Sequence, residues 1–306
     1  MTSAPSLPAD ARALLPPDLA FAPARRLGRA WRFVPRTSST MADAAAWAGE
    51  GAPHGALVLT DHQTAGRGRH GRAWHDAPGH SLLLTLVLRP DGLAPERLGL
   101  VPVAAGVALA EAAEAARAAP AGAPPQALRL KWPNDVLAGG RKLAGVLAEA
   151  TWGAPARART AGPEGRREAG HDAPCVLLGV GANVGRAAVP PALADQATSL
   201  AACGYAATRG ALLSAFLRAL EQRLDALAAP DGPATLCADA TRRLAGRGAP
   251  ARVAFPHTAR APLTGTLEGL APDGALVLGT PEGPVRVYAG EVTLAAPNAL
   301  HPDASP

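Results

Sequence analysis

The stretch that decides the fold is GALVLTDHQTAGRGRHGRAWHDAPGHSLLLTLVLRP, residues 55–90. Its two ends, residues 55–61 and 80–90, are apolar runs of strand length, and Pro90 stops the second run. Between them, residues 62–74 alternate three glycines with three arginines and end in Trp74. Because this basic segment joins two core strands, it is predicted to be a loop inside a folded domain and not a disordered tract.

Strand and helix patterns mix on both sides of this stretch, which indicates an α/β (α+β) domain over residues 31–245. Ser39 or Thr40 can cap the first helix, and Gly49 and Gly51 can end it. Strands are predicted at 31–36, 55–61, 80–90, 127–136, 141–152 and 175–184, and helices at 37–51, 98–119, 210–229 and 234–245.

Three further regions differ in composition from this domain. Residues 1–30 carry five prolines and are predicted to be a flexible tail. Residues 153–174 are rich in Pro, Gly and Arg without periodicity, which predicts a disordered insert at a hairpin. Residues 246–300 contain five short strand patterns separated by turns, which indicates a small barrel.

The bulk properties bound the class of protein. The chain has 306 residues, a net charge of +5 and a pI near 9.7, which permits an acidic partner. Its three cysteines are far apart, so inert thiols in a reducing compartment are favoured over disulfides or zinc. We find no signal peptide and no run approaching ~20 apolar residues, so a cytoplasmic, soluble protein that does not bind membranes is expected.

The basic loop has the composition of an anion-binding element. Guanidinium groups bind phosphate or carboxylate in a bidentate manner, and glycines let backbone amides approach an anion. Trp74 offers a face for a ring to stack on. A solvated surface loop would explain the same composition. The residues concerned are Arg67, Arg69 and Arg72 with Gly66, Gly68 and Gly71.

Polar residues at strand ends supply further candidates, each with a structural alternative. Lys131, Asn134 and Asp135 form an ordinary turn or hold a metal-bound phosphate. Lys142 is an edge lysine or a cation aimed at a reacting anion, and Gly145 marks close approach of backbone or ligand.

Hydroxyl and amide side chains complete the candidates. Asn183 ends a glycine-rich strand and forms a turn or contacts an adenine edge. Ser39 and Thr40 cap a helix or bond a neutral ligand, as Gln63 could also do.

The segments TSSTM (37–41), QTAGRGRHGRAW (63–74), KWPNDV (131–136), RKLAGVL (141–147) and GVGANV (179–184) together resemble the biotin–protein ligases, also called biotin–[acetyl-CoA-carboxylase] ligases. The resemblance spans about residues 31–294. It implies a mixed β-sheet catalytic domain similar to lipoate ligases and class II tRNA synthetases, followed by an SH3-like C-terminal domain.

The implied reaction has two steps. Biotin and Mg-ATP give biotinyl-5′-AMP, and a lysine of the biotin carboxyl carrier protein then takes the biotin. The N-terminal DNA-binding repressor domain of some members is missing, so operator DNA binding is not expected, whereas a homodimer is compatible with the family.

The resemblance also assigns residues by position. It implies that Lys142 and Arg67 neutralise the charge of the reacting groups, which suits a step that brings two anions together. Asp135 would help hold magnesium. The implied biotin site comprises Ser39, Thr40, Gln63, Gly66, Arg67, Gly68, Arg69, Lys142 and Gly145. The implied ATP site comprises Arg67, Arg69, Arg72, Trp74, Asn134 and Asn183. A loop that closes over the ligand would protect the acyl-adenylate from water.

Two positions depart from the family pattern. Met41 stands where many members have Asn, and Ala295 follows GEVTL where a basic residue is common. Two other functions remain open: a lipoate or octanoate ligase-like acyltransferase, whose families lack the GRGRxGR motif, and a nucleic-acid-binding protein that uses the Gly-Arg loop. A steep dependence of nucleic-acid affinity on salt would favour the latter.

Overall fold

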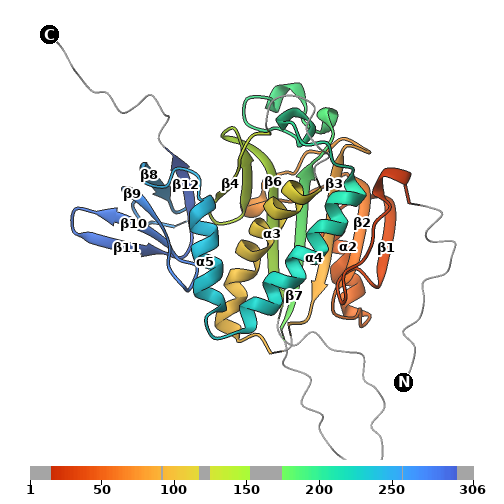
Figure 1. The fold of residues 1–306 in the computed structure, drawn as a ribbon, viewed down its shortest axis with the longest axis horizontal. Coiled ribbons are helices and arrows are strands. Elements are labelled where there is room, and N and C mark those ends of the chain that lie inside the picture. The colour runs from red at the N-terminus through yellow and green to blue at the C-terminus, as the bar shows by residue number, and fades with distance from the viewer. Residues whose placement is uncertain (1–14, 91, 117–124, 152–173, 257, 295–306) are drawn as a thin grey trace, which may run out of the picture.

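The computed structural model describes residues 15–90, 92–116, 125–151, 174–256 and 258–294. They form a large α/β part and a small all-β part, which lie side by side in Figure 1. The predicted insert at 153–174 falls almost wholly outside the described residues. Ala295, one of the two departures, also lies outside them.

A seven-stranded sheet forms the frame of the large part, with strand order β1-β2-β3-β7-β6-β5-β4. Strands β1 and β2 are parallel, and the other neighbouring pairs are antiparallel, so the sheet is mixed as expected. The strands are β1 (Trp31–Thr37), β2 (Ala56–Gln63), β3 (Ser81–Leu88), β4 (Leu128–Lys131), β5 (Asp135–Ala138), β6 (Arg141–Thr151) and β7 (Cys175–Asn183).

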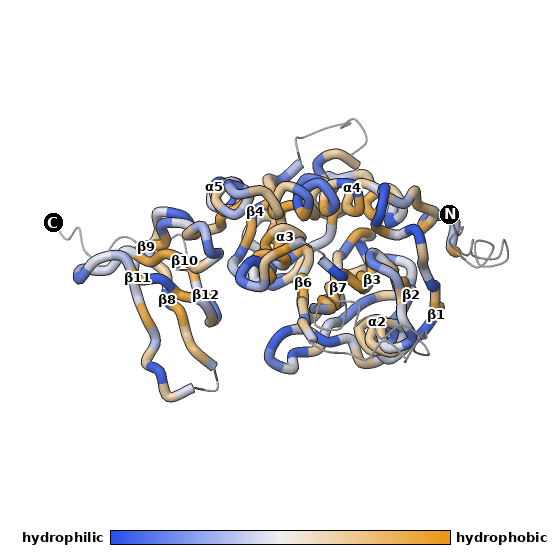
Figure 2. Tube along the Cα trace, turned by 90° about the horizontal axis from the view of Figure 1, so that it is seen from below, coloured by the Kyte–Doolittle hydropathy of each residue, from blue (hydrophilic) through white to orange (hydrophobic). Residues whose placement is uncertain are grey.

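Helices cover both faces of this sheet because its strands alternate two apolar faces. In β2, Leu57 and Leu59 face the main core with α3 (Val101–Ala115) and α4 (Arg209–Ala228). Ala56 and Val58 face the opposite side, where they pack with α2 (Thr40–Gly49). Figure 2 shows the apolar residues concentrated between these layers.

Most of the helices and strands predicted from the sequence have bounds within a few residues of those in the structure. Of the two candidate caps of the first helix, Ser39 is the one used, and its Oγ accepts from the Met41 N–H at 3.3 Å. Residues 127–136, predicted as a strand that runs into a turn, form β4, a turn at 132–134 and the start of β5, and β5 pairs with β4. The pairing of β6 with β7 is confirmed.

Residues 15–30 do not form the flexible tail that was predicted for them. Leu19 and Leu27 are each 1% exposed and belong to the main core. Asp18 pairs with the buried Arg209, whose Nε donates to Asp18 Oδ2 at 2.7 Å. The prolines therefore shape an ordered segment, including a 3-10 turn at Pro17–Leu19, and residues 1–14 lie outside the described part.

One helical stretch corrects the expectation that no segment is apolar enough to span a membrane. Pro95–Ala115 passes that test by length and composition, but 67% of its apolar window is buried inside the protein. It therefore serves as a core helix that packs against the sheet and against α4.

The small part begins after α5 (Gly232–Arg243) and is a five-stranded antiparallel sheet with the order β11-β10-β9-β8-β12. Its own core includes Val253, Leu276 and Val287. This agrees with the small SH3-like domain expected from the sequence. The strands are β8 (Pro250–Ala254), β9 (Leu263–Leu270), β10 (Leu276–Thr280), β11 (Gly283–Val287) and β12 (Glu291–Leu294).

Candidate functional site

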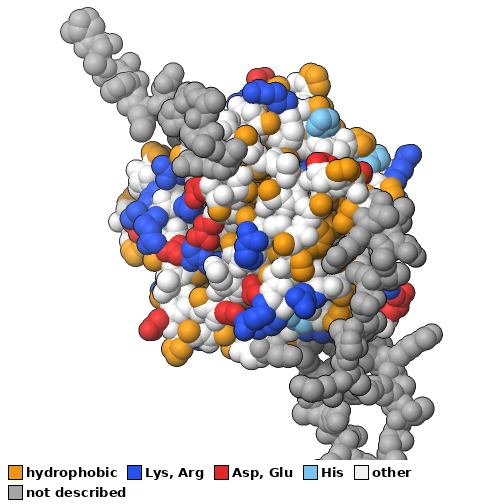
Figure 3. Space-filling view, turned by 45° about the vertical axis from the view of Figure 1, so that its right-hand side comes forward, with side chains coloured by type: hydrophobic (Ala, Val, Ile, Leu, Met, Phe, Trp, Pro, Cys, Tyr) orange, Lys and Arg blue, Asp and Glu red, His pale blue; other side chains and the backbone are white. Residues whose placement is uncertain are grey.

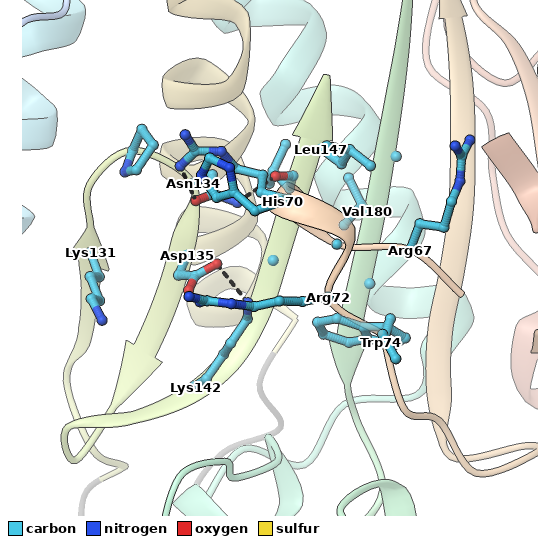
Figure 4. Close-up of a pocket in the computed structure, with 18 of the residues that line it drawn as sticks. Arg67, His70, Arg72, Trp74, Lys131, Asn134, Asp135, Lys142, Leu147 and Val180 are labelled. Atoms are coloured by element: carbon cyan, nitrogen blue, oxygen red, sulfur yellow. Dashed lines mark hydrogen bonds and ion pairs between the residues drawn. The ribbon is translucent and has the colours of Figure 1, made fainter. Parts of the chain in front are cut away.

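A cavity of about 250 Å³ opens on the α2 side of the sheet. The basic loop folds over it, and Figure 4 shows side chains from the loop, the β4–β5 turn and β6 converging on it. The small part contributes the start of β12. The cavity therefore gathers segments that are far apart in the sequence.

The basic loop is a short hairpin and not an open tract. The Trp74 N–H donates to the Gly66 carbonyl at 2.9 Å, and the Gly68 N–H donates to the Arg72 carbonyl at 2.7 Å. The chain reverses at His70 and Gly71, which have φ values of 56° and 72°. Gly71 adopts this conformation without strain, and histidine is among the few other residue types that are enriched in it. The hairpin brings Trp74 back toward the sheet.

Trp74 lies on a floor made of glycines from β6 and β7. A Cβ added at Gly181 would lie 2.6 Å from Trp74 Cε2, and one at Gly145 would lie 3.3 Å from Trp74 Cζ3. Side chains at these strand positions would therefore displace the ring. The indole N–H is buried and has no partner among the described residues.

Positive groups surround this floor. Lys142 Nζ lies 2.8 Å from Asp135 Oδ1 and 5.6 Å from the centre of the Trp74 ring. Arg69 Nη1 donates to Asn134 Oδ1 at 3.3 Å, and Asn134 Nδ2 donates to the Val146 carbonyl at 2.8 Å. Burial lowers the pKa of the Arg69 guanidinium, against the opposing effect of Asp135. The strand-end residues thus hold two cations at one end of the cavity.

The other two loop arginines are directed elsewhere. Arg72 Nη2 donates to Glu291 Oε1 of β12 at 2.6 Å, which ties the loop to the small part. Arg67 points away from Lys142 in Figure 4, and its Nη2 lies 3.9 Å from Glu149 Oε1. Each of these two arginines therefore has a carboxylate beside it.

The opposite end of the cavity is polar and uncharged. Gln63 Oε1 accepts from the Thr40 backbone N–H at 2.9 Å and from Thr40 Oγ1 at 3.2 Å, and Thr85 Oγ1 donates to Thr40 Oγ1 at 2.9 Å. Met41 is 4% exposed, and its Sδ lies 2.9 Å from the place of a Cβ at Gly179. Met41 therefore gives this part of the cavity an apolar wall.

Most of the sequence-predicted residues line this one cavity. Gly66, Gly71 and Asn183 do not. Gly66 contributes its backbone to the loop hairpin. The residues that do line it are Ser39, Thr40, Gln63, Arg67, Gly68, Arg69, Arg72, Trp74, Lys131, Asn134, Asp135, Lys142 and Gly145.

Asn183 lies behind the cavity, in contact with the segment that supports Lys142. It is 5% exposed, and its Nδ2 donates to the Thr198 carbonyl at 3.0 Å. The Thr198 N–H in turn donates to the Lys142 carbonyl at 2.8 Å, and the Lys142 N–H donates to the Gln196 carbonyl at 2.8 Å. The Oδ1 atom of Asn183 has no hydrogen-bond partner among the described residues.

Sequence reasoning missed Glu291, which lines the cavity from the small part. Its partner Arg72 is 219 residues away, and a glutamate at a strand start carries no local signal for such a contact. Among the described residues, no three His, Cys, Asp or Glu side chains lie close enough together to bind a metal ion. Magnesium held through phosphates needs only one or two carboxylates, and Asp135 and Glu291 are those that line the cavity.

Two family models match the chain. Residues 33–162 match the Biotin/lipoate A/B protein ligase family, and residues 257–294 match the Biotin protein ligase C terminal domain. These matches cover the basic loop, the β4–β5 turn and most of the small part.

Related proteins extend over more of the chain. A biotin--[acetyl-CoA-carboxylase] ligase of Mycobacterium tuberculosis is 38% identical over 202 residues, which cover 64% of this chain and 66% of that protein. One of Paracoccus denitrificans is 33% identical over 270 residues, 85% of this chain and 98% of that protein.

Solved structures agree with the fold. A biotin protein ligase from Aquifex aeolicus in complex with biotin and ATP superposes with a TM-score of 0.68, at 24% identity over 87% of this chain and 99% of that chain. Taken with the 33% identity along nearly the whole Paracoccus protein, the matches show that this chain belongs to the biotin protein ligase family.

Proposed function

We propose that this chain activates biotin with ATP to biotinyl-5′-AMP and pyrophosphate, and then transfers the biotin to a lysine of the biotin carboxyl carrier protein of acetyl-CoA carboxylase. The observation that carries the proposal is one cavity with a neutral polar end, at Thr40 and Gln63, and a cationic end, at Lys142 and Arg69. Biotin has matching ends, a neutral ureido ring and a carboxylate. The relatives from M. tuberculosis and P. denitrificans carry the name of this activity.

The first step joins two anions, so its main requirement is fixed positive charge. An oxygen of the biotin carboxylate attacks the α-phosphorus, the new P–O bond forms, and the bond from the α-phosphorus to the bridging oxygen of the leaving pyrophosphate breaks. Lys142 lies between the Trp74 ring and Asp135, where its ammonium group would stabilise charge on the α-phosphate oxygens. Arg67 would join Lys142 once its distant contact with Glu149 gives way.

The second step transfers the acyl group. A lysine amine of the carrier protein attacks the acyl carbon, the acyl–oxygen bond breaks, and AMP leaves with its electron pair. Lys142 and Arg69 would stabilise the phosphate charge of the leaving AMP. The lysine ammonium must lose one proton before it attacks, and the nitrogen loses a second as the amide forms; water can accept both at the open cavity.

The remaining assignments follow from position in the cavity. Ser39, Thr40 and Gln63 would bond the ureido ring, with Gly66 through Arg69 and Gly145 bounding the biotin. Trp74 would pack against adenine, and Asn134 and Arg72 would contact the nucleotide. Magnesium would neutralise phosphate charge, with Asp135 as its protein ligand. Asn183 would reach the nucleotide only through its unpartnered Oδ1, since its amide nitrogen is already engaged.

Nucleic-acid binding has weaker support. The Gly-Arg segment is a single hairpin over a cavity, and Arg72 is already paired with Glu291. The face drawn in Figure 3 carries basic and acidic side chains side by side and no continuous basic patch. Arg223 with Glu111 and Arg243 with Glu114 are examples of such pairing on the helices.

Two further expectations belong to this proposal. The three cysteines, Cys175, Cys203 and Cys237, are free and buried, which suits a reducing compartment such as the cytoplasm. A homodimer remains an expectation from the family, and sedimentation of the purified protein would test it.

The experiment that tests the function is exchange of labelled pyrophosphate into ATP in the presence of different acids. Exchange that requires biotin supports the proposal. Exchange supported by lipoate or octanoate instead would mean that the chain carries out the same adenylation chemistry on a different acid. The matched Biotin/lipoate A/B protein ligase family includes both biotin and lipoate in its name. Absence of exchange with every acid would refute the proposal.

A further inference from the structure

A buried carboxylate closes the base of the basic loop. Asp76 follows Trp74 by two residues, and its side chain is only 1% exposed. Its Oδ2 lies 2.9 Å from His62 Nδ1, and its Oδ1 accepts from the Gln63 backbone N–H at 3.4 Å. The two contacts join the segment that enters the loop to the segment that leaves it.

The two joined segments carry both ends of the cavity. Gln63 holds the polar end, where its Oε1 accepts two hydrogen bonds from Thr40. Trp74 covers the glycine floor at Gly181. Because Asp76 bonds to His62 and Gln63 and is separated from Trp74 by one residue, it fixes the spacing between the side chains of the polar end and the ring on the floor.

The chemistry of Asp76 makes this contact specific. An ionised carboxylate only accepts hydrogen bonds, so His62 Nδ1 is the donor in this pair. Removing a carboxylate from water is costly unless hydrogen bonds compensate, and here both carboxylate oxygens have a donor. His62 is more accessible, at 31% side-chain exposure, so it can be altered with less effect on packing.

We propose that Asp76 is a positioning residue for the ligand cavity: through His62 and the Gln63 backbone it holds the base of the basic loop closed and sets Gln63 relative to Trp74. The inference rests on the proposed function only where it concerns biotin. The closed loop base is a property of the ligand-free protein and can be measured without any substrate.

The test compares Asp76→Asn, His62→Ala and the wild type, with Asp225→Asn as control. Asn keeps the size of Asp76 but loses its charge. Asp225 is an ion-paired carboxylate on α4, bonded to Arg25, and does not line the cavity. The first readout is the rate of tryptic cleavage after Arg67, Arg69 and Arg72 in the ligand-free protein, resolved by mass spectrometry from cleavage elsewhere. The second is KM for biotin against kcat in pyrophosphate exchange.

Loss of a hydrogen bond to a charged group weakens an interaction by about tenfold or more. Asp76→Asn and His62→Ala should therefore each raise cleavage in the loop by about tenfold and raise KM for biotin by a similar factor, while kcat changes by less than about twofold. Adding His62→Ala to Asp76→Asn should add little to the effect of Asp76→Asn, since the Asp76–His62 contact is shared by both changes.

Unchanged loop cleavage in both variants would overturn the inference. So would cleavage that rises in parallel at sites throughout the chain, because this would assign Asp76 to general stability. A wild-type protein without biotin-dependent exchange would count against the proposed function alone, since the cleavage readout needs no substrate.

Discussion

Replacing Gly181 by alanine should push Trp74 off its place on the sheet. The added Cβ would lie 2.6 Å from Trp74 Cε2 and 2.7 Å from Cζ2, whereas carbon atoms in contact normally lie about 3.5–4.0 Å apart. The ring must therefore move by about 1 Å. Overpacking of this kind costs about 1–3 kcal/mol, and the low end applies because Trp74 belongs to a loop that can shift.

Two measurements follow from this displacement. We expect the melting temperature to fall by about 2 °C, the change that corresponds to about 1 kcal/mol in a chain of this size. We expect KM for ATP in biotin-dependent exchange to rise by about tenfold, because the face proposed to pack against adenine is displaced.

The control is Gly99→Ala, because a Cβ at Gly99 meets nothing within 4 Å. Adding Trp74→Ala to Gly181→Ala should remove the further effect of the glycine change, since the clashing ring is gone. If Gly181→Ala has the melting temperature and KM of the wild type, Trp74 does not rest on this glycine and the description of the floor is incorrect.

Three further predictions concern the fold. Leu217→Ala should lower the free energy of unfolding in urea by about 2–5 kcal/mol, because Leu217 is fully buried in the main core; a smaller loss would contradict that packing. The hydrogen bond from Arg209 lowers the pKa of Asp18 below its ordinary value of 3.8. Its ionised form therefore stabilises the folded state above that value, and this stabilisation is lost as the pH falls through the lowered pKa. The difference in melting temperature between wild type and Asp18→Asn should accordingly be constant at neutral pH and shrink below pH 3.8, whereas a difference that persists in acid would argue against the pair. Burial raises the pKa of the Cys237 thiol to about 11, so a thiol reagent at neutral pH should label it slowly in the native protein and rapidly after unfolding.

Local patterns were enough to predict the elements that position the site. The apolar runs at 55–61 and 80–90 became β2 and β3, and the segment between them became the loop over the cavity. Gly145 of RKLAGVL was correctly expected at a close approach, because a strand interior needs glycine only where something comes near the backbone. In this structure, the Trp74 ring is what lies against the backbone at this glycine and at Gly181.

The contacts that the sequence did not reveal all depend on distant residues. Leu19 and Leu27 lie in an irregular segment with prolines at 16, 17 and 23, so their burial against the main core had no periodic signal. Glu291 reaches Arg72 only because the small part packs beside the cavity. Asn183 was expected at the nucleotide, yet its amide donates to Thr198, in an irregular segment whose path no local pattern predicts.

The measurement that tests the central claim most directly is biotin-dependent exchange of pyrophosphate into ATP by the wild type and Lys142→Ala, side by side. Loss of a fixed positive group at the reacting phosphate should lower the exchange rate by about 10²–10³. Stability should change by less than about 1 kcal/mol, because the Lys142–Asp135 pair is partly exposed, with side-chain exposures of 38% and 20%. Exchange that proceeds without biotin, or that is unaffected by Lys142→Ala, would contradict the claim that this cavity adenylates biotin with Lys142 at the α-phosphate.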